Sequence, residues 1–384
     1  MARVTPVALP SWPDSGEMAT AYSDCIERTR ETLYERLLDA PAAGVLREYF
    51  ERAKMLRAFL VFAASASVGG DPDDVLMAAV AIELLHGASL FHDDIIDQAS
   101  TRRGMVSLHE RLGVGPALVI GDGLLLEAFA ALAEARACHS AARVLEATRT
   151  LNQLARECCR GQFDELGAER WVSEADYLAI VRGKTAAPFV AAGVLGILLG
   201  RGTRAQVAQI RIYSREVGIA FQIGDDLLDL VGEPRVLGKP AGNSLAQGRP
   251  MLPLIYLWET SSEAEQRELR RLGEGRWTRH DLVELLEERG ILDRVRRVQH
   301  RHVEAAIAAL KGFRDRAGVD ALRALAARAS VTLAAGSGAS RNEQQRVTKK
   351  GSPPPGRDEG AVAGDGAVPR SGGLVVPQFR ARPR

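Results

Sequence analysis

Two aspartate clusters with the same pattern, DDIID at Asp93–Asp97 and DDLLD at Asp225–Asp229, are the residues of this chain best suited to chemistry. In each cluster the first and last aspartates are four positions apart, so on a helix they lie on one face. Carboxylates this close repel one another unless they share a cation. Mg²⁺ is usually held by one or two carboxylates together with substrate phosphates. The clusters therefore predict two facing sets of carboxylates that bind metal ions, with a phosphorylated substrate held between them.

The sequence around the clusters separates them from the solvated acidic face that a single DDxxD motif usually forms. Both lie inside apolar runs, LLHGASLFHDDIID and IAFQIGDDLLDL. Acidic side chains in apolar sequence indicate a lined cavity or a metal site. The candidate catalytic and metal-binding carboxylates are Asp93, Asp94, Asp97, Asp225, Asp226 and Asp229.

Basic and polar residues recur near these clusters, where they would meet phosphate groups. Arg102 and Arg103 follow the first cluster, and guanidinium groups bind phosphates in two-point contacts. His86 precedes Asp93 by about two helical turns. A solvated arginine pair and a buried core histidine are the ordinary alternatives. The candidate substrate-binding residues are Lys54, Arg57, His86, Arg102, Arg103, Lys184, Thr185, Gln222 and Lys239.

Helices are the elements expected to position these side chains. From about Ala19 to Ala335, apolar residues recur at helical spacing, and two-residue alternation is scarce. Aromatic residues make up only 5% of the chain, whereas Ala and Leu abound, which favours helices. We therefore predict an all-α fold, a single large helical bundle over residues 19–335 around a central cavity. Residues 1–18 are an expected N-terminal extension, and residues 336–384, rich in Gly, Pro, Ser and charge, an expected disordered tail.

The composition of the chain indicates which partners and which cellular compartment to expect. The net charge is +1, so no global field favours nucleic acid or an anionic membrane. The cysteines lack the spacing of metal ligands or of a disulfide framework, which favours the reducing cytoplasm. No signal peptide is evident, and the longest apolar stretch, Pro188–Leu199, is too short to span a bilayer. The sequence therefore predicts a soluble cytoplasmic protein without a transmembrane segment.

The motifs together resemble the trans-isoprenyl diphosphate synthase family, also called polyprenyl synthetases. The resemblance covers roughly residues 54–253 and rests on DDIID with its x4-RRG continuation, RRGMVSLH, GKT, FQIGDDLLD and GKPAG. It implies the isoprenoid synthase type I fold and a homodimer. It also implies a Mg²⁺-dependent prenyltransferase that joins isopentenyl diphosphate head-to-tail to an allylic diphosphate, giving an all-trans polyprenyl diphosphate.

The resemblance also implies a role for each candidate residue. Three Mg²⁺ ions would bridge the allylic diphosphate to Asp93, Asp97 and Asp225, supported by Asp94, Asp226 and Asp229. The same diphosphate would be held by Arg102, by Lys184 with its neighbour Thr185, and by Lys239. Isopentenyl diphosphate would occupy a separate, metal-free pocket formed by Lys54, Arg57, His86 and Arg103. Gln222 would lie near the reacting allylic carbons.

Two segments depart from the family pattern. Arg52 and Ala53 precede Lys54, where the family usually has two glycines that let backbone N–H groups approach a phosphate. After GKPAG the family usually carries an aspartate, whereas this chain has Ser244, and Arg249 replaces a lysine. These changes leave open a non-catalytic or regulatory partner subunit of another prenyl synthase. A class I terpene cyclase is a further alternative, although its second motif is normally of the NSE type rather than DDLLD.

Small residues before the first cluster bear on product length. Ala88 and Ser89 precede Asp93 by five and four positions, so no aromatic side chain closes an elongation channel there. The resemblance then implies a product of twenty carbons or longer. Phe129 is a candidate floor lower in the channel, or equally an ordinary core aromatic.

Overall fold

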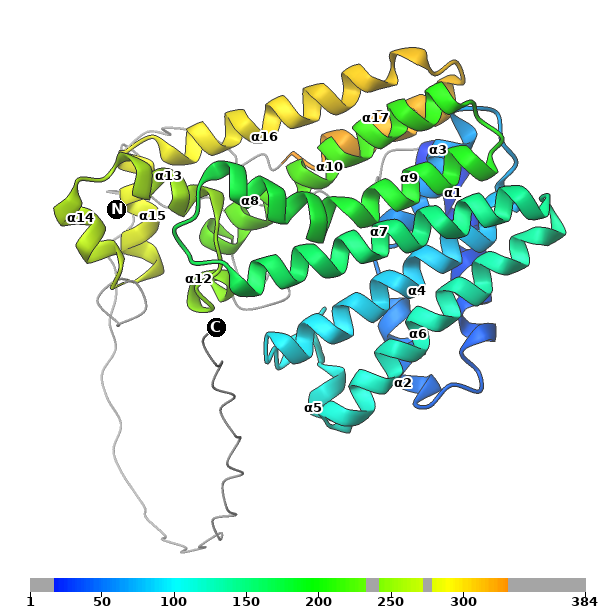
Figure 1. Ribbon diagram of the computed structural model, residues 1–384, viewed down its shortest axis with the longest axis horizontal. Helices are drawn as coiled ribbons and strands as arrows, with labels where there is room; N and C mark the ends of the chain where they lie inside the picture. The colour runs from blue at the N-terminus through cyan, green and yellow to red at the C-terminus, as the bar shows by residue number, and fades with distance from the viewer. Residues whose placement is uncertain (1–16, 233–241, 272–277, 331–384) are drawn as a thin grey trace, which may run out of the picture. The chain divides into compact units, whose positions relative to one another are not determined.

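Helices make up most of the chain that the computed structural model describes, which is residues 17–232, 242–271 and 278–330 (Figure 1). The predicted all-α fold is therefore confirmed. The only strands among these residues are β1 (Thr101–Arg102) and β2 (Met105–Val106), which pair antiparallel.

The helices follow one another in a simple order. The first half of the chain contains α1 (Glu17–Arg36), α2 (Ala43–Glu51), α3 (Leu56–Ala66), α4 (Pro72–Ile96), α5 (Leu108–Leu112), α6 (Val114–Glu134), η1 (Ala135–Ala137) and α7 (Ala141–Gly167). The middle contains α8 (Glu174–Val181), η2 (Arg182–Ala186), α9 (Ala187–Leu199), α10 (Arg204–Val231) and α12 (Asn243–Ala246). The last part contains α13 (Leu252–Thr260), α14 (Glu263–Leu269), α15 (Arg279–Glu288), α16 (Ile291–Ala308), η3 (Ala309–Gly312) and α17 (Arg316–Arg328). The domain boundaries at residues 19 and 335 stay a prediction.

Helix α4 shows how the sequence sets the bounds of an element. Its N-cap is Asp71, whose side chain accepts a hydrogen bond from the Asp73 N–H at 2.9 Å, and Pro72 occupies the first helical turn. The helix ends at Ile96, with Asp97 as its C-cap. The first aspartate cluster therefore lies in the last turn of α4.

Helix α10 links two parts of the apolar core. It begins with a capping box formed by Thr203 and Gln206 and ends at Val231. Buried residues between Ile210 and Ala220 pack in one cluster with α3, α4, α9 and α17, and those from Ile219 onward pack in a second cluster with α13, α15 and α16. The second aspartate cluster lies in this last, deeply packed part of α10.

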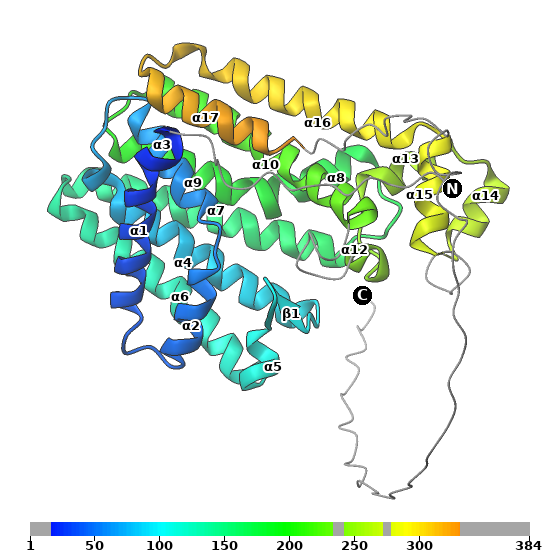
Figure 2. The same ribbon diagram turned by 180° about the vertical axis from the view of Figure 1, so that it is seen from behind.

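Helix α9 forms the common support for the helices that carry the two clusters. Its sequence, APFVAAGVLGILL, is apolar on every face, and every residue except Leu198 is buried. It packs against α3, α4, α7 and α10. On the side seen in Figure 2, α1 packs on α3 and α4. Helices α4 and α10 therefore share one apolar support.

In the described part of the chain, three helical segments are long and apolar enough to cross a membrane by length and composition: Pro72–Ile96, Val114–Ala137 and Glu174–Leu199. The fold buries 67% of the apolar window in the first and third segments but only 39% in Val114–Ala137. The expectation of no transmembrane segment therefore stays a prediction. Of the three, the segment containing α6 has the most uncovered apolar surface.

Candidate active site

The two aspartate clusters occupy equivalent places in the fold, the C-terminal ends of α4 and α10. A helix C-terminus carries partial negative charge from its aligned peptide dipoles, so each carboxylate there is disfavoured by about 0.3–1 kcal/mol. Such a placement needs compensating positive charge or hydrogen-bond donors. The structure provides positive charge and hydrogen-bond donors near the clusters. The six carboxylates differ in how many such partners they have.

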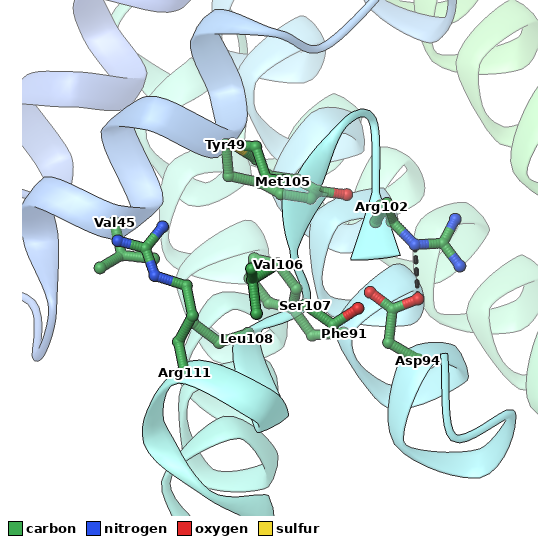
Figure 3. A pocket seen from close by; sticks show the side chains of 10 residues that line it. All are labelled: Val45, Tyr49, Phe91, Asp94, Arg102, Met105, Val106, Ser107, Leu108 and Arg111. Carbon is green, nitrogen blue, oxygen red and sulfur yellow. Dashed lines mark hydrogen bonds and ion pairs between the residues drawn. The ribbon is translucent and has the colours of Figure 1, made fainter. Parts of the chain in front are cut away.

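Asp94 is the inward member of the first cluster. Its side chain is buried, and Arg102 Nε donates to its Oδ1 at 2.6 Å (Figure 3). Burial raises the pKa of Asp94, and the Arg102 guanidinium opposes that rise. Arg102 lies on β1, and the turn to β2 uses Arg103 and Gly104 with φ values of 53° and 73°. The RRG sequence therefore forms a tight hairpin turn that directs its first arginine at the cluster.

Asp226 is the inward member of the second cluster, and its carboxylate accepts three hydrogen bonds. The donors are the Tyr177 hydroxyl at 2.7 Å, Gln222 Nε2 at 3.0 Å and the Leu252 N–H at 3.1 Å. Burial raises the pKa of Asp226 to about 7, although these hydrogen bonds act in the opposite direction. The Thr185 hydroxyl donates to Gln222 Oε1 at 2.7 Å. Both ends of the Gln222 amide are therefore fixed.

Asp229 ends the second cluster and caps the short helix α12. Its side chain is buried, and the N–H groups of Asn243 and Ser244 donate to its two oxygens at 3.3 and 2.9 Å. Its own carbonyl accepts from the Gly242 N–H at 2.8 Å. Ser244, which stands where the resemblance leads one to expect an aspartate, thus takes part in the site through its backbone.

The other three aspartates differ in their exposure to solvent. Asp93 is half-exposed and Asp225 is exposed, whereas the Asp97 side chain is only 9% exposed. Arg249 pairs with the Asp97 carboxylate, and Gln247 Nε2 donates to the Asp97 carbonyl at 3.0 Å.

A metal fits this arrangement only if the substrate shares in binding it. Within the described ranges, no group of three or more His, Cys, Asp or Glu side chains is placed to hold a metal ion. The accessible donors are carboxylate oxygens on two different helices. Mg²⁺ suits such donors, because it takes one or two carboxylates from a protein and completes its shell with substrate phosphates and water.

Lys184 lies in the π-helical turn η2, whose conformation follows from a proline. Pro188 has no N–H, so the Lys184 carbonyl lacks its usual helical partner four residues along. The Cys158 thiol donates to this carbonyl at 3.3 Å instead. Insertions of this kind are frequent at functional sites in helices.

Glu165 is a residue of the site that the sequence analysis missed. Its helix, α7, touches η2 so closely that a Cβ on Gly161 would lie 2.2 Å from the Lys184 backbone nitrogen. One turn beyond Gly161, Glu165 Oε2 pairs with Lys184 Nζ at 2.5 Å and with Arg249 Nη1 at 3.5 Å. Burial raises the pKa of Glu165, and Lys184 opposes that rise. In the sequence Glu165 is one acid of GQFDEL, a segment that gives no sign of these partners.

Three of the four residues predicted to bind isopentenyl diphosphate form one electrostatic cluster. Burial lowers the pKa of His86 well below its usual value, and the nearby guanidinium groups of Arg57 and Arg103 lower it further. Arg57 stacks on the Phe189 ring at 4.6 Å, and Arg103 stacks on the Tyr49 ring at 4.8 Å. Arg57 Nε and Arg103 Nη1 are buried and have no hydrogen-bond partner in the described part of the chain. Buried donors without partners are costly, so this cluster is suited to an anionic ligand.

Lys54, the fourth predicted residue, lies in the turn between α2 and α3. The Arg30 guanidinium donates to the carbonyls of Phe50, Glu51 and Ala53 at 2.8, 2.7 and 2.9 Å. These bonds fix the path of the chain just before Lys54. They do so at the place where the family pattern would have two glycines.

Four further residues were singled out in the sequence: Lys239, Ala88, Ser89 and Phe129. Lys239 is outside the described residues. Ala88 is buried, and the Ser89 hydroxyl donates to the His86 carbonyl at 2.8 Å. Phe129 is partly buried in α6 and lines a surface groove with Thr148, Arg149, Asn152, Gln153 and Arg156 of α7.

Comparisons with known proteins show which family and which proteins the chain is similar to. The model of the family described as polyprenyl synthetase matches residues 41–288. The chain is 35% identical over 249 residues to a short chain isoprenyl diphosphate synthase of Methanothermobacter thermautotrophicus, over 63% of this chain and 76% of that protein. It is 37% identical over 225 residues to a geranylgeranyl diphosphate synthase of Mycobacterium tuberculosis, over 58% of this chain and 62% of that protein.

The structural similarity extends over more of the chain than the sequence similarity. A polyprenyl synthase of Caulobacter crescentus, solved with calcium and isoprenyl diphosphate, matches with a TM-score of 0.75 at 29% identity. The match covers 83% of this chain and 97% of that protein. A geranylgeranyl pyrophosphate synthetase of Pyrococcus horikoshii matches with a TM-score of 0.71 at 30% identity, over 81% and 99% of the two chains.

Proposed function

The chain belongs to the polyprenyl synthetase family and is a prenyltransferase, and we propose that it condenses isopentenyl diphosphate with an allylic diphosphate in a Mg²⁺-dependent reaction. The arrangement that carries this proposal is the pair of aspartate clusters at the C-terminal ends of α4 and α10, with Arg102, Lys184 and Arg249 beside them. Calcium in the Caulobacter crescentus synthase supports a divalent metal here.

The six aspartates divide into two roles under this proposal. Asp93, Asp97 and Asp225 hold the metal ions, three per site. Asp93 and Asp225 are accessible to ligands, and Asp97, whose side chain pairs with Arg249, ends the first cluster beside them. The other three aspartates are buried and accept hydrogen bonds from groups of the protein, which keeps the two clusters in place. These are Asp94, Asp226 and Asp229. When bound, Mg²⁺ supplies positive charge that stabilises the leaving diphosphate.

Residues of the chain hold the allylic substrate and direct its ionisation. Arg102 and Lys184 bind the allylic diphosphate, and Lys239 joins them under this proposal. The bond between C1 and oxygen breaks, its electron pair goes to the diphosphate, and fixed cations stabilise this charge where it develops. The allylic cation lies among apolar helices that exclude water. Gln222 faces the reacting carbons with an amide that Asp226 and Thr185 hold in one orientation.

The second substrate binds in the basic cluster around His86. Isopentenyl diphosphate places its phosphates against Lys54, Arg57, His86 and Arg103. There the buried Arg57 Nε and Arg103 Nη1 groups can donate hydrogen bonds to an anion. Its double bond attacks C1 of the allylic cation. Loss of a proton to the departed diphosphate then regenerates an allylic product.

The product has twenty carbons or more under this proposal. Ala88 and Ser89 are small residues five and four positions before Asp93, so no aromatic side chain stands at those two positions. Geranylgeranyl diphosphate synthases of Mycobacterium tuberculosis and Methanosarcina mazei are 37% and 34% identical to the chain. If Phe129 is the floor of the elongation channel, Phe129→Ala lengthens the product.

The protein is a homodimer in the cytoplasm under the same proposal. Exposed apolar side chains on α6, with exposed fractions of 47–71%, support a second copy as the covering partner: Val114, Leu118, Val119 and Leu126. An uncovered apolar helix face of this kind marks an interface. Light scattering on the purified protein distinguishes the dimer from the monomer.

Local contacts weaken the partner-subunit alternative. Arg30 holds the turn before Lys54 in place of the missing glycines, and the Ser244 N–H contributes to Asp229. No observation of the described residues favours a cyclase over a synthase.

The test is a product assay with several primers. The purified protein is incubated with Mg²⁺, labelled isopentenyl diphosphate and dimethylallyl, farnesyl or geranylgeranyl diphosphate, and dephosphorylated products are separated by length. The expected result is a metal-dependent product of twenty carbons or more. It is lost in Asp93→Asn and kept in Asp39→Asn, the same change at an exposed position away from the clusters. Absence of elongated product with every primer contradicts the proposal.

A further inference from the structure

Four charged side chains form one alternating row along the site. Asp97 pairs with Arg249, Arg249 Nη1 lies 3.5 Å from Glu165 Oε2, and the same oxygen lies 2.5 Å from Lys184 Nζ. All four are largely shielded from water, with exposed side-chain fractions of 9%, 21%, 14% and 16% in that order. The row joins the end of α4 to α7 and η2.

Glu165 is the member on which both cations converge. Lys184 and Arg249 come from segments far apart in the chain, and each lies within 3.5 Å of a single Glu165 oxygen. Two cations this close repel each other, and shielding from water strengthens that repulsion. The Glu165 carboxylate cancels it. Without this negative charge, the two long side chains would separate and lose their fixed geometry.

The backbone around Glu165 is rigid at both ends of these contacts. Gly161 and Gly183 allow α7 and η2 to touch, which fixes Lys184 opposite Glu165. Arg249 follows α12, whose first N–H groups are held by Asp229. Glu165 therefore contacts two segments whose backbones are already fixed, η2 and the segment after α12. Its carboxylate sets the positions of the Lys184 and Arg249 side chains.

We propose that Glu165 is a positioning residue. It holds Lys184 and Arg249 side by side, so that the two cations together bind the diphosphate of the allylic substrate. Glu165 itself touches neither the substrate nor the metal. Arg249 is thereby assigned to substrate binding, a role that the sequence analysis did not give it. The inference rests on the proposed function, since it concerns the same diphosphate.

The test compares two isosteric substitutions on one helix. Glu165→Gln keeps the shape of the side chain and removes its charge, and Glu146→Gln makes the same change at an exposed position of α7. Thermal unfolding of both variants is measured first. Steady-state kinetics then give kcat and the two KM values, and calorimetry gives the affinity for inorganic diphosphate with Mg²⁺.

The expected result is a selective effect on the diphosphate site. Glu165→Gln lowers kcat/KM for the allylic substrate and the affinity for inorganic diphosphate by at least ~10-fold, because the two cations lose their fixed positions. The KM for isopentenyl diphosphate stays at the wild-type value, as do all constants of Glu146→Gln. Glu165→Asp, which keeps the charge on a shorter side chain, recovers part of the loss.

Three outcomes would overturn the proposal. In the first, Glu165→Gln behaves like the wild type in both kinetics and calorimetry. In the second, both KM values rise together with a fall in unfolding temperature, which indicates a general structural role. In the third, only the Mg²⁺ concentration for half-maximal activity changes, which indicates a metal ligand. Should the wild type make no product, the proposed function fails, while calorimetry with inorganic diphosphate still tests Glu165.

Discussion

Two aspartates of the same DDLLD motif are expected to respond to substitution in opposite ways. Asp229 is buried and accepts the N–H groups of Asn243 and Ser244 at the start of α12. Asp229→Ala removes both bonds and leaves two donors without partners. A hydrogen bond to a charged group contributes about 1.5–3 kcal/mol, and the 3.3 Å bond belongs at the weak end, so a loss of roughly 3 kcal/mol is expected. Asp225→Ala, at an exposed position, changes the free energy of unfolding by no more than about 0.5 kcal/mol.

Urea unfolding followed by circular dichroism measures this difference in stability. Hydrogen exchange at Asn243 and Ser244 locates it, because their amides exchange faster once the cap is lost. Asp225→Ala is expected to keep the stability of the wild type and to lose prenyltransferase activity. Equal stabilities of Asp229→Ala and Asp225→Ala, with unchanged exchange at α12, would refute the division of the motif into a metal-binding and a structural aspartate.

Three further changes probe other parts of the molecule. Arg30→Met releases the carbonyls before Lys54 and is expected to raise the KM for isopentenyl diphosphate by roughly 10-fold, with the allylic KM unchanged in steady-state assays. Burial raises the pKa of Glu216, but the hydrogen bonds and charges of His302 and Arg215 together outweigh burial and leave that pKa below 4.5. The folded state therefore gains stability above pH 4.5 and loses it as the pH falls through the folded pKa. Urea titrations below pH 4.5 should show this loss in the wild type and not in Glu216→Gln. Leu118→Glu places a charge on the exposed face of α6 and is expected to give monomers by light scattering, whereas dimers would contradict the proposed interface.

The fold was predictable because its signals are local. Apolar residues at helical spacing predicted the helices, and the structure confirms an all-α fold. The position of the clusters in apolar runs predicted buried surroundings, and Asp94 and Asp226 are buried. Each of these inferences needs only the residues within one helix.

The division of labour among the aspartates was not predictable from spacing. Four-residue spacing predicts one common face, yet Asp225 is exposed and Asp229 is buried. Asp229 is buried because the N-terminus of α12 packs on it, and this contact depends on the tertiary fold. Asp97 is likewise a C-cap whose partner, Arg249, comes from a distant segment.

Glu165 and the π-helical turn were missed for the same reason. Glu165 lies in a segment that resembles a solvated acidic stretch, and its meaning depends on Lys184 and Arg249 arriving from elsewhere. Pro188 could have signalled an unpaired Lys184 carbonyl, but the sequence does not reveal that Cys158 supplies the donor. Pairings between segments far apart in the chain are set by packing, which single-sequence patterns do not encode.

The most direct test of the central claim is the binding of farnesyl thiodiphosphate, an allylic analogue that ionises slowly, measured by calorimetry with and without Mg²⁺. The claim is that Asp93 and Asp225, on two different helices, bind one diphosphate through shared metal ions. We predict binding by the wild type only with Mg²⁺, weakened at least ~10-fold in both Asp93→Asn and Asp225→Asn. Binding of equal strength without Mg²⁺, or in either variant, would contradict the account.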